Sequence, residues 1–267
     1  MVSQNPVSSV GNRLFGANSL PVRVCYRGPT DELMLLAELR KKVLEANLEL
    51  VRKGLVLYTF GNASGISRKD GLVVIKPSGV PYDQMRPVDL VVTGLEGKVV
   101  EGKLRPSSDL PTHLVLYKAF PAIGGISHTH SEYATAWAQA QRPIPCFGTT
   151  HADSCHGPVP VTEELKNAEI ASDYEENTGR AILGTFDGRD VAAVPAVLVA
   201  NHGAFAWGPD AGTSAHNAVI LESVARMAYF TLGINSKADA IGRPLHDEHF
   251  LRKHGKDPYY GQPKEKK

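Results

Sequence analysis

The sequence predicts a single α/β domain in which a central β-sheet is covered by helices. Its 267 residues, 42% hydrophobic and 21% charged, have the length and composition of one globular domain. Short apolar runs separated by glycine and proline fill much of the first half, and helical and strand patterns alternate in the second half. No internal repeat is present, so a repeat architecture is not predicted.

The first ordered element is expected after an N-terminal extension. Residues 1–33 are rich in Ser, Asn and Pro and have no acidic residue before Asp31, which predicts a disordered extension. A transit peptide has a similar composition, and a start codon assigned too early, with Met34 as the true start, is the alternative. The folded domain is therefore expected over residues 34–267. Apolar residues at three- and four-residue steps predict an amphipathic helix over 31–53, ended by Gly54.

The remaining elements follow from periodicity and turn signals. β-type runs bounded by turn residues occur at 55–60, 65–67, 72–76, 90–93 and 98–101. Further along, helices are predicted at 111–120, 132–141, 162–183 and 211–232, and strands at 124–129 and 196–200. The charged, aromatic tail 243–267 is too polar to form core, and is either a free end or an arm that docks elsewhere.

Composition excludes several classes of partner. The formal net charge is +1, from 29 basic and 28 acidic residues, so the chain lacks the basic excess expected of a nucleic-acid binder. No run approaches the roughly 18 apolar residues of a membrane-spanning helix. The three cysteines form no Cys-x-x-Cys pair, which favours a reducing compartment and predicts a cytoplasmic protein. A small molecule is the expected partner.

Four residues form a candidate metal site. Side chains two apart on a strand point the same way, so His128 and His130 at the end of the strand 124–129 can share a metal ion. His202 follows the strand 196–200, and Asp109 precedes Pro111. Each has an ordinary alternative, because histidines at strand ends are often structural and Asp109 suits a helix N-cap. Three histidines and one carboxylate together are typical of zinc.

Polar turns provide candidate substrate contacts. The turn Lys76-Pro77-Ser78-Gly79 offers backbone N–H groups and a cation for a phosphate, although it serves equally well as a hairpin connection. Further candidates are Ser107, Ser108, Gly61 and Asn62. Asp153, in a polar loop, is a candidate general acid or base, with a plain surface loop as the alternative.

Taken together, these motifs resemble the class II aldolase/epimerase family, and within it the pentulose-phosphate 4-epimerases. The resemblance extends from residues 43–48 to 259–262. It implies a single domain with a central, mainly antiparallel sheet and helices on both faces. It also implies one divalent cation per subunit, zinc or another metal such as manganese, on Asp109, His128, His130 and His202. The implied proton-transfer groups are Asp153 and Tyr260, and the implied substrate contacts are Gly61, Asn62, Lys76, Ser78, Gly79, Ser107, Ser108 and His249.

The resemblance also implies an activity and an assembly. The expected reaction interconverts L-ribulose 5-phosphate and D-xylulose 5-phosphate by breaking and re-forming the C3–C4 bond. The expected assembly is a homotetramer with active sites between subunits, so that His249 and Tyr260 are supplied in trans. The alternatives are a sugar-phosphate aldolase of the same family, in which the residue at position 109 is typically glutamate, and a non-catalytic adducin-like protein. Arabinose, ascorbate and gulose pathways all remain open.

Overall fold

Seven strands form one antiparallel sheet in the computed structural model, which describes residues 34–262. The strands are β1 (Asn62–Ser67), β2 (Leu72–Ile75), β3 (Val91–Gly94), β4 (Val99–Glu101), β5 (Gly125–Thr129), β6 (Ala196–Val199) and β7 (Gly203–Gly208). Their order is β4-β3-β2-β1-β5-β7-β6, and each pair of neighbours runs antiparallel. The predicted single domain with a central antiparallel sheet is confirmed.

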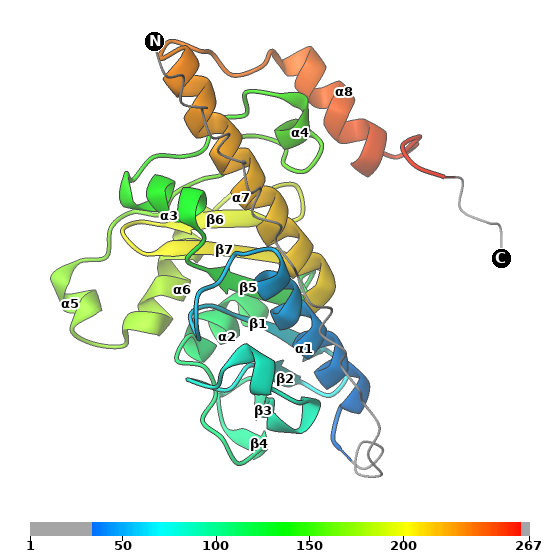
Figure 1. Cartoon of the computed structure of the whole chain (residues 1–267), viewed down its shortest axis with the longest axis vertical. Helices are drawn as coiled ribbons and strands as arrows, with labels where there is room; N and C mark the ends of the chain where they lie inside the picture. Colours follow the sequence, from blue (N-terminus) through cyan, green and yellow to red (C-terminus); the bar gives the residue numbers. More distant parts are fainter. Residues whose placement is uncertain (1–33, 263–267) are drawn as a thin grey trace, which may run out of the picture.

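Alternate residues of each strand face two different apolar layers, as the pleat requires. In β7, Ala204 and Ala206 pack with α1 (Ala37–Arg52), α3 (Glu132–Gln139) and α7 (Ala211–Ile234). Phe205 and Trp207 pack on the other side with α2 (Leu110–Ala119) and α6 (Tyr174–Thr185). Helices therefore cover both faces of the sheet, as Figure 1 shows.

Small residues let α7 lie directly on the middle of the sheet. A Cβ atom on Gly125 of β5 would come within 2.3 Å of the Ala211 backbone nitrogen. Next along β5, the hydroxyls of Ser127 and Ser214 lie 2.8 Å apart in the interface. This close packing fixes β5 and β7, the two strands that carry or flank the histidines discussed below.

Several boundaries differ from the sequence predictions. Residues 55–60 form turns rather than a strand, with Tyr58 at a φ of 52°. Residues 162–183 do not form one helix: the backbone N–H of Thr162 donates to Leu198 at the edge of β6, and the helical part splits into α5 (Asn167–Ile170) and α6. β7 was not predicted, because its glycines and alanines mask the alternating Phe205 and Trp207.

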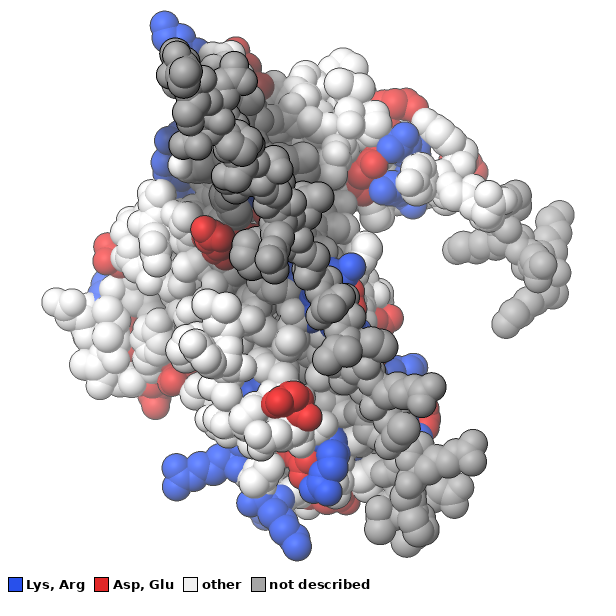
Figure 2. Space-filling view, viewed as in Figure 1, with Lys and Arg blue, Asp and Glu red and all other residues white. Residues whose placement is uncertain are grey.

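The tail forms a helix that the polar sequence did not predict. This helix, α8 (Arg243–His254), extends from the main body and contacts the short helix α4 (Thr149–Ala152) (Figure 1). On the face shown in Figure 2, Lys and Arg lie among Asp and Glu near this end, in agreement with the balanced net charge. Within the described residues no helix has the length and apolar character to cross a membrane. The predicted extension 1–33 lies outside the described residues.

Candidate functional site

Three histidines meet at one end of the central strands. His128 lies in β5, His130 follows that strand, and His202 lies in the turn between β6 and β7. One ligating atom of each lies within 4.8 Å of those of the other two. The sheet brings them together because β5 and β7 are paired, with His128 opposite Phe205. The predicted grouping of the three histidines is therefore present in the fold.

The ring of His128 is held in one orientation. Its Nδ1 lies 3.0 Å from the carbonyl oxygen of Ala204, to which it can only donate, and the ring stacks on Phe205 at 4.2 Å. With a proton placed on Nδ1 by this contact, Nε2 is the ring nitrogen left to accept a hydrogen bond or to bind a metal. It faces Nε2 of His130 at 3.0 Å. Two unprotonated nitrogens this close repel each other unless a cation or a proton lies between them.

Burial keeps His130 and His202 in the metal-binding form. Burial, followed by the neighbouring His128, lowers the pKa of His130. Burial also lowers the pKa of His202, to about 4. Neutral imidazole is the form that coordinates metals. The donor set therefore fits a divalent cation that accepts nitrogen ligands, such as zinc.

Asp109 lies beside the histidines without being part of the compact group. It precedes α2, but its side chain makes no capping hydrogen bond, so capping does not explain it. Instead, its Oδ2 accepts a hydrogen bond of 2.7 Å from Nδ2 of Asn62, which is paired with His128 across the β1–β5 ladder. Burial raises the pKa of Asp109, but the surrounding histidines act in the opposite direction, so the pKa stays below its usual range. An ionised carboxylate at this place is suited to a cation; its coordination remains a prediction.

The predicted phosphate turn lies next to the segment before Asp109. Pro77 and Pro106 form an antiparallel bridge, and the backbone N–H of Ser107 donates to the Lys76 carbonyl at 2.9 Å. The Ser107 hydroxyl also lies 3.1 Å from Asn62 Nδ2. These contacts bring the predicted substrate residues of three separate segments to one region; Ser78, Gly79 and Ser108 are exposed there.

Two details of the turn differ from the expectation. The backbone N–H of Ser78 donates to the carbonyl of Arg105 at 2.9 Å, so this amide is not free to bind a phosphate, and only the hydroxyl of Ser78 remains available. Lys76 is 2% exposed, and its amine lies 3.2 Å from the Pro77 carbonyl and 4.8 Å from the Tyr82 ring. Burial lowers the pKa of Lys76 to about 8. Its amine is thus directed into the protein.

Asp153 is bound by the tail helix. It ends α4, and its carboxylate receives both a bidentate pair from Arg252, at 3.0 and 2.7 Å, and Nδ1 of His249 at 3.0 Å. Lys253 Nζ lies 3.3 Å away. Partial burial raises the pKa of Asp153, but these hydrogen bonds outweigh it and bring the pKa down to about 2. The predicted acid or base is an ionised carboxylate in this arrangement.

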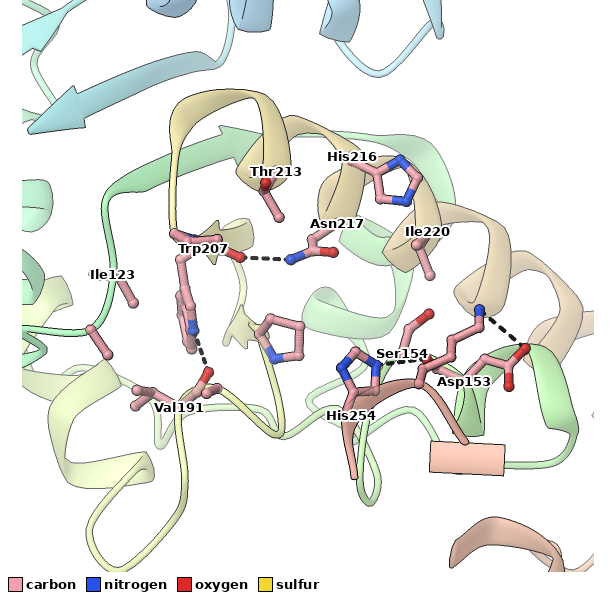
Figure 3. Close-up of a pocket in the computed structure, with 16 residues that line it drawn as sticks. Ile123, Asp153, Ser154, Val191, Trp207, Thr213, His216, Asn217, Ile220 and His254 are labelled. Atoms are coloured by element: carbon pink, nitrogen blue, oxygen red, sulfur yellow. Dashed lines mark hydrogen bonds and ion pairs between the residues drawn. The ribbon is translucent and has the colours of Figure 1, made fainter. Parts of the chain in front are cut away.

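Tyr260 belongs to the same junction. Its ring lies 4.9 Å from the Arg252 guanidinium carbon and 4.4 Å from Lys253 Nζ, and it is 59% exposed. A cavity of about 420 Å³ lies next to this junction and is lined by Asp153, His254 and Trp207, among others. Figure 3 shows Asp153 and His254 at one end of it. None of the three histidines lines this cavity. Among the described residues, no hydrogen bond, ion pair or ring contact joins the Asp153 junction to the histidine group.

The family follows from comparison with known proteins. A model of the class II aldolase and adducin N-terminal domain matches residues 41–229. The chain belongs to the class II aldolase and adducin family. Curated proteins similar to this chain include L-ribulose-5-phosphate 4-epimerase UlaF of Salmonella paratyphi B and of Salmonella paratyphi A. Each is 51% identical over 227 residues, which is 85% of this chain and 100% of the relative.

Solved class II structures agree with the fold. An L-fuculose 1-phosphate aldolase superposes with a TM-score of 0.69 at 25% identity, covering 81% of this chain and 96% of the aldolase. YgbL from Klebsiella pneumoniae superposes with a TM-score of 0.66 at 27% identity, covering 80% of this chain and 99% of that chain.

A second group of ligand-type side chains in this class II chain serves a structural purpose. His156, His246 and Asp247 lie within 4.8 Å of one another. However, the two imidazole rings stack at 5.0 Å with planes only 19° apart, whereas a shared cation must lie in the plane of both rings. His156 Nε2 already pairs with Asp247 at 2.8 Å, and Nε2 of His246 already lies 3.1 Å from the Gly157 amide. The group holds α8 to the loop after α4.

One residue beside the histidines was missed by the sequence analysis. The hydroxyl of Tyr174, at the first position of α6, lies 3.3 Å from Nδ1 of His202. A tyrosine 28 positions before a histidine gives no sequence signal of contact. Only the packing of α6 against the sheet brings the two together.

Proposed function

We propose that this chain is a metal-dependent epimerase that interconverts L-ribulose 5-phosphate and D-xylulose 5-phosphate. The observation that carries the proposal is the group of three histidines beside Asp109. It is supported by the identity of 51% to relatives named as L-ribulose-5-phosphate 4-epimerase, which the alignment covers over their whole length.

The substrate chemistry explains why inversion at C4 requires a carbon–carbon bond to break. The C4 hydrogen is not activated by a neighbouring carbonyl, so inversion by direct removal of that proton is slow. Removal of the C4 hydroxyl proton instead lets the C3–C4 bond break, and its electron pair forms the enediolate of dihydroxyacetone. Glycolaldehyde phosphate is the other fragment. Rotation of the aldehyde and attack on its opposite face re-form the bond with C4 inverted.

The chain's own residues would divide this work. Asp109, His128, His130 and His202 would hold the cation, which we propose to be zinc or manganese, one per subunit. When bound, a divalent cation there supplies Lewis acidity toward negative oxygen. The phosphate-bearing fragment must turn over without escaping, and the proposed contacts that retain it are Gly61, Asn62, Ser78, Gly79, Ser107 and Ser108, with Lys76 acting from beneath the turn by its charge.

Proton transfer is proposed for Asp153 and Tyr260. Epimers differ in the direction of the C4 oxygen, so two groups on opposite faces are required. Because the junction that holds Asp153, His249 and Tyr260 is not joined to the histidine group among the described residues of the same chain, we propose that it acts on a neighbouring subunit in a homotetramer. A carboxylate with a pKa near 2 is a weak base. We therefore expect some of the contacts from Arg252, Lys253 and His249 to Asp153 to break when substrate binds.

A coupled assay with pure L-ribulose 5-phosphate and a titration of zinc and manganese tests the proposal. Metal-dependent formation of D-xylulose 5-phosphate is expected, and Tyr260→Phe is expected to slow turnover without changing metal content. Release of free aldehyde from another ketose phosphate, with no epimerisation, would assign an aldolase instead, which is the alternative favoured by the L-fuculose 1-phosphate aldolase superposition. A protein that binds no divalent metal would be an adducin-like binding protein.

The cellular setting is also a proposal. Cys146 and Cys155 are free, buried thiols, which supports a cytoplasmic location. Arabinose catabolism is the proposed pathway, and growth of a deletion strain on single sugars would separate it from ascorbate- and gulose-type routes.

A further inference from the structure

His202 lacks the support of a paired strand that His128 has. His128 lies within a paired strand, and its ring is fixed by the Ala204 carbonyl and by Phe205. His202 instead lies in a turn, after Asn201 at a φ of 60°. In the described part of the chain, the hydroxyl of Tyr174 makes the one hydrogen bond to the His202 ring, at 3.3 Å. The other contacts of this ring are with the rings of His128, His130 and Phe205, so Tyr174 provides the directional contact to a nitrogen of this ring.

Tyr174 is itself held in place from two directions. Its backbone carbonyl accepts a hydrogen bond of 2.9 Å from the Thr178 hydroxyl one turn later in α6. The next carbonyl, of Glu175, accepts one of 2.5 Å from Thr112, which is buried in α2. Because α2 begins directly after Asp109, helix α2 both carries the candidate carboxylate at its start and holds the first turn of α6.

We propose that Tyr174 is a positioning residue for His202, by accepting a hydrogen bond from its Nδ1–H. This bond keeps the proton on Nδ1 and leaves Nε2 unprotonated, so that Nε2 is available to the cation. Ala204 does the same for His128 through a backbone carbonyl. The site thus uses a backbone acceptor for the histidine in the strand and a side-chain acceptor for the histidine in the turn.

The role proposed for Tyr174 belongs to its hydroxyl group and not to its aromatic ring. The Tyr174 and His202 rings are also in contact, with centroids 6.0 Å apart, so the aromatic ring could support His202 by packing alone. Tyr174→Phe retains that packing and removes only the acceptor. Tyr174→Leu removes both.

Metal binding to the purified, metal-free protein tests the proposal, which rests on the histidine site proposed above. Zinc affinity is measured by competition with a chelating dye, and the geometry at the site by the visible absorption spectrum of the cobalt(II) form. We expect Tyr174→Phe to weaken zinc binding by about 10–100-fold and to change the cobalt spectrum. Tyr174→Leu should lose a similar amount. Tyr229→Phe, at a 58% exposed tyrosine of α7, is the matched control and should match the wild type.

The outcomes distinguish the role of Tyr174 from the proposed function. Wild-type zinc affinity and an unchanged cobalt spectrum in Tyr174→Phe would overturn the positioning role, as would a loss confined to Tyr174→Leu. Far-UV circular dichroism of the metal-free variants shows whether a loss reflects unfolding. If the wild-type protein binds zinc but does not epimerise the sugar phosphate, the proposed function fails while the role of Tyr174 is still decided by these measurements.

Discussion

Gly61→Ala is expected to disturb the histidine site through the backbone of β5. Gly61 has a φ of +76°, and a Cβ atom there would lie 2.7 Å from the carbonyl oxygen of His128 and 2.8 Å from Cγ1 of Val56. The contact with His128 involves backbone, so it can be relieved only by moving β1 or β5. Gly71 is a matched control, since its φ is +65° and nothing lies within 4 Å of a Cβ atom built on it.

The two substitutions share one cost and differ in another. An alanine in the left-handed region costs about 1–2 kcal/mol at either position. At Gly61 the contacts with His128 and Val56 add about 1–3 kcal/mol, as expected for an overpacked site. Displacing the His128 backbone also misaligns its ring, and each 1.4 kcal/mol of misalignment weakens binding by about tenfold.

Denaturation and metal binding measure these two effects. Urea unfolding of the metal-free proteins, followed by far-UV circular dichroism at one protein concentration, should place Gly61→Ala below Gly71→Ala in stability. Zinc competition should show at least about tenfold weaker binding for Gly61→Ala and wild-type binding for Gly71→Ala. Equal stability and equal zinc affinity of the two variants would refute the reasoning.

Three further predictions follow from the contacts. Ser64→Ala should destabilise the metal-free protein by about 1–3 kcal/mol in urea unfolding, because it leaves the buried His113 Nδ1 and Tyr117 hydroxyl without the partner now at 2.7 and 2.8 Å. Ser67→Ala, at the end of β1, removes only a solvent-exposed hydrogen bond to Asp70 and should cost less. Asp153→Asn should increase hydrogen exchange in α8 at pH 7, because it weakens the charged junction. Chelation of the cation should lower the thermal midpoint, by the equivalent of about 2.7 kcal/mol when the free metal is at a hundred times its Kd.

The Asp153 junction also predicts a dependence on pH. The pKa of this carboxyl is about 2 in the folded chain, below its ordinary value of 3.8, so its ionised form is the one that stabilises docking. The stabilisation is complete above about pH 4 and is lost as the pH falls toward 2. Protection of the α8 amides, taken relative to their intrinsic exchange rate at each pH, should therefore fall over this window in the wild type, whereas Asp153→Asn should show no such step. Similar pH profiles for both proteins would remove Asp153 from the docking of α8.

Much of the fold was predictable because it depends on local patterns. The apolar run of β2 between turn residues and the helical period of α1 are written in neighbouring positions, and both predictions were confirmed to within a few residues. The prediction of one helix over 162–183 was wrong because the start of this segment is hydrogen-bonded to the edge of β6. This long-range contact outweighs helical periodicity. The helix α8 was missed because its polar sequence has no apolar period, and its support comes from ion pairs with α4.

For the site, the sequence by itself determined which residues are chemically able to bind a metal. The spacing of His128 and His130 is local, and their common face follows from the pleat of one strand. Only the tertiary structure decided how these groups are held. Tyr174 reaches His202 because α6 packs on the sheet, and the pKa of Asp153 is lowered because α8 brings Arg252 to it from 99 residues away. Hydrogen bonds between distant segments leave no period in the sequence, so the supports of the site become visible only once the chain is folded.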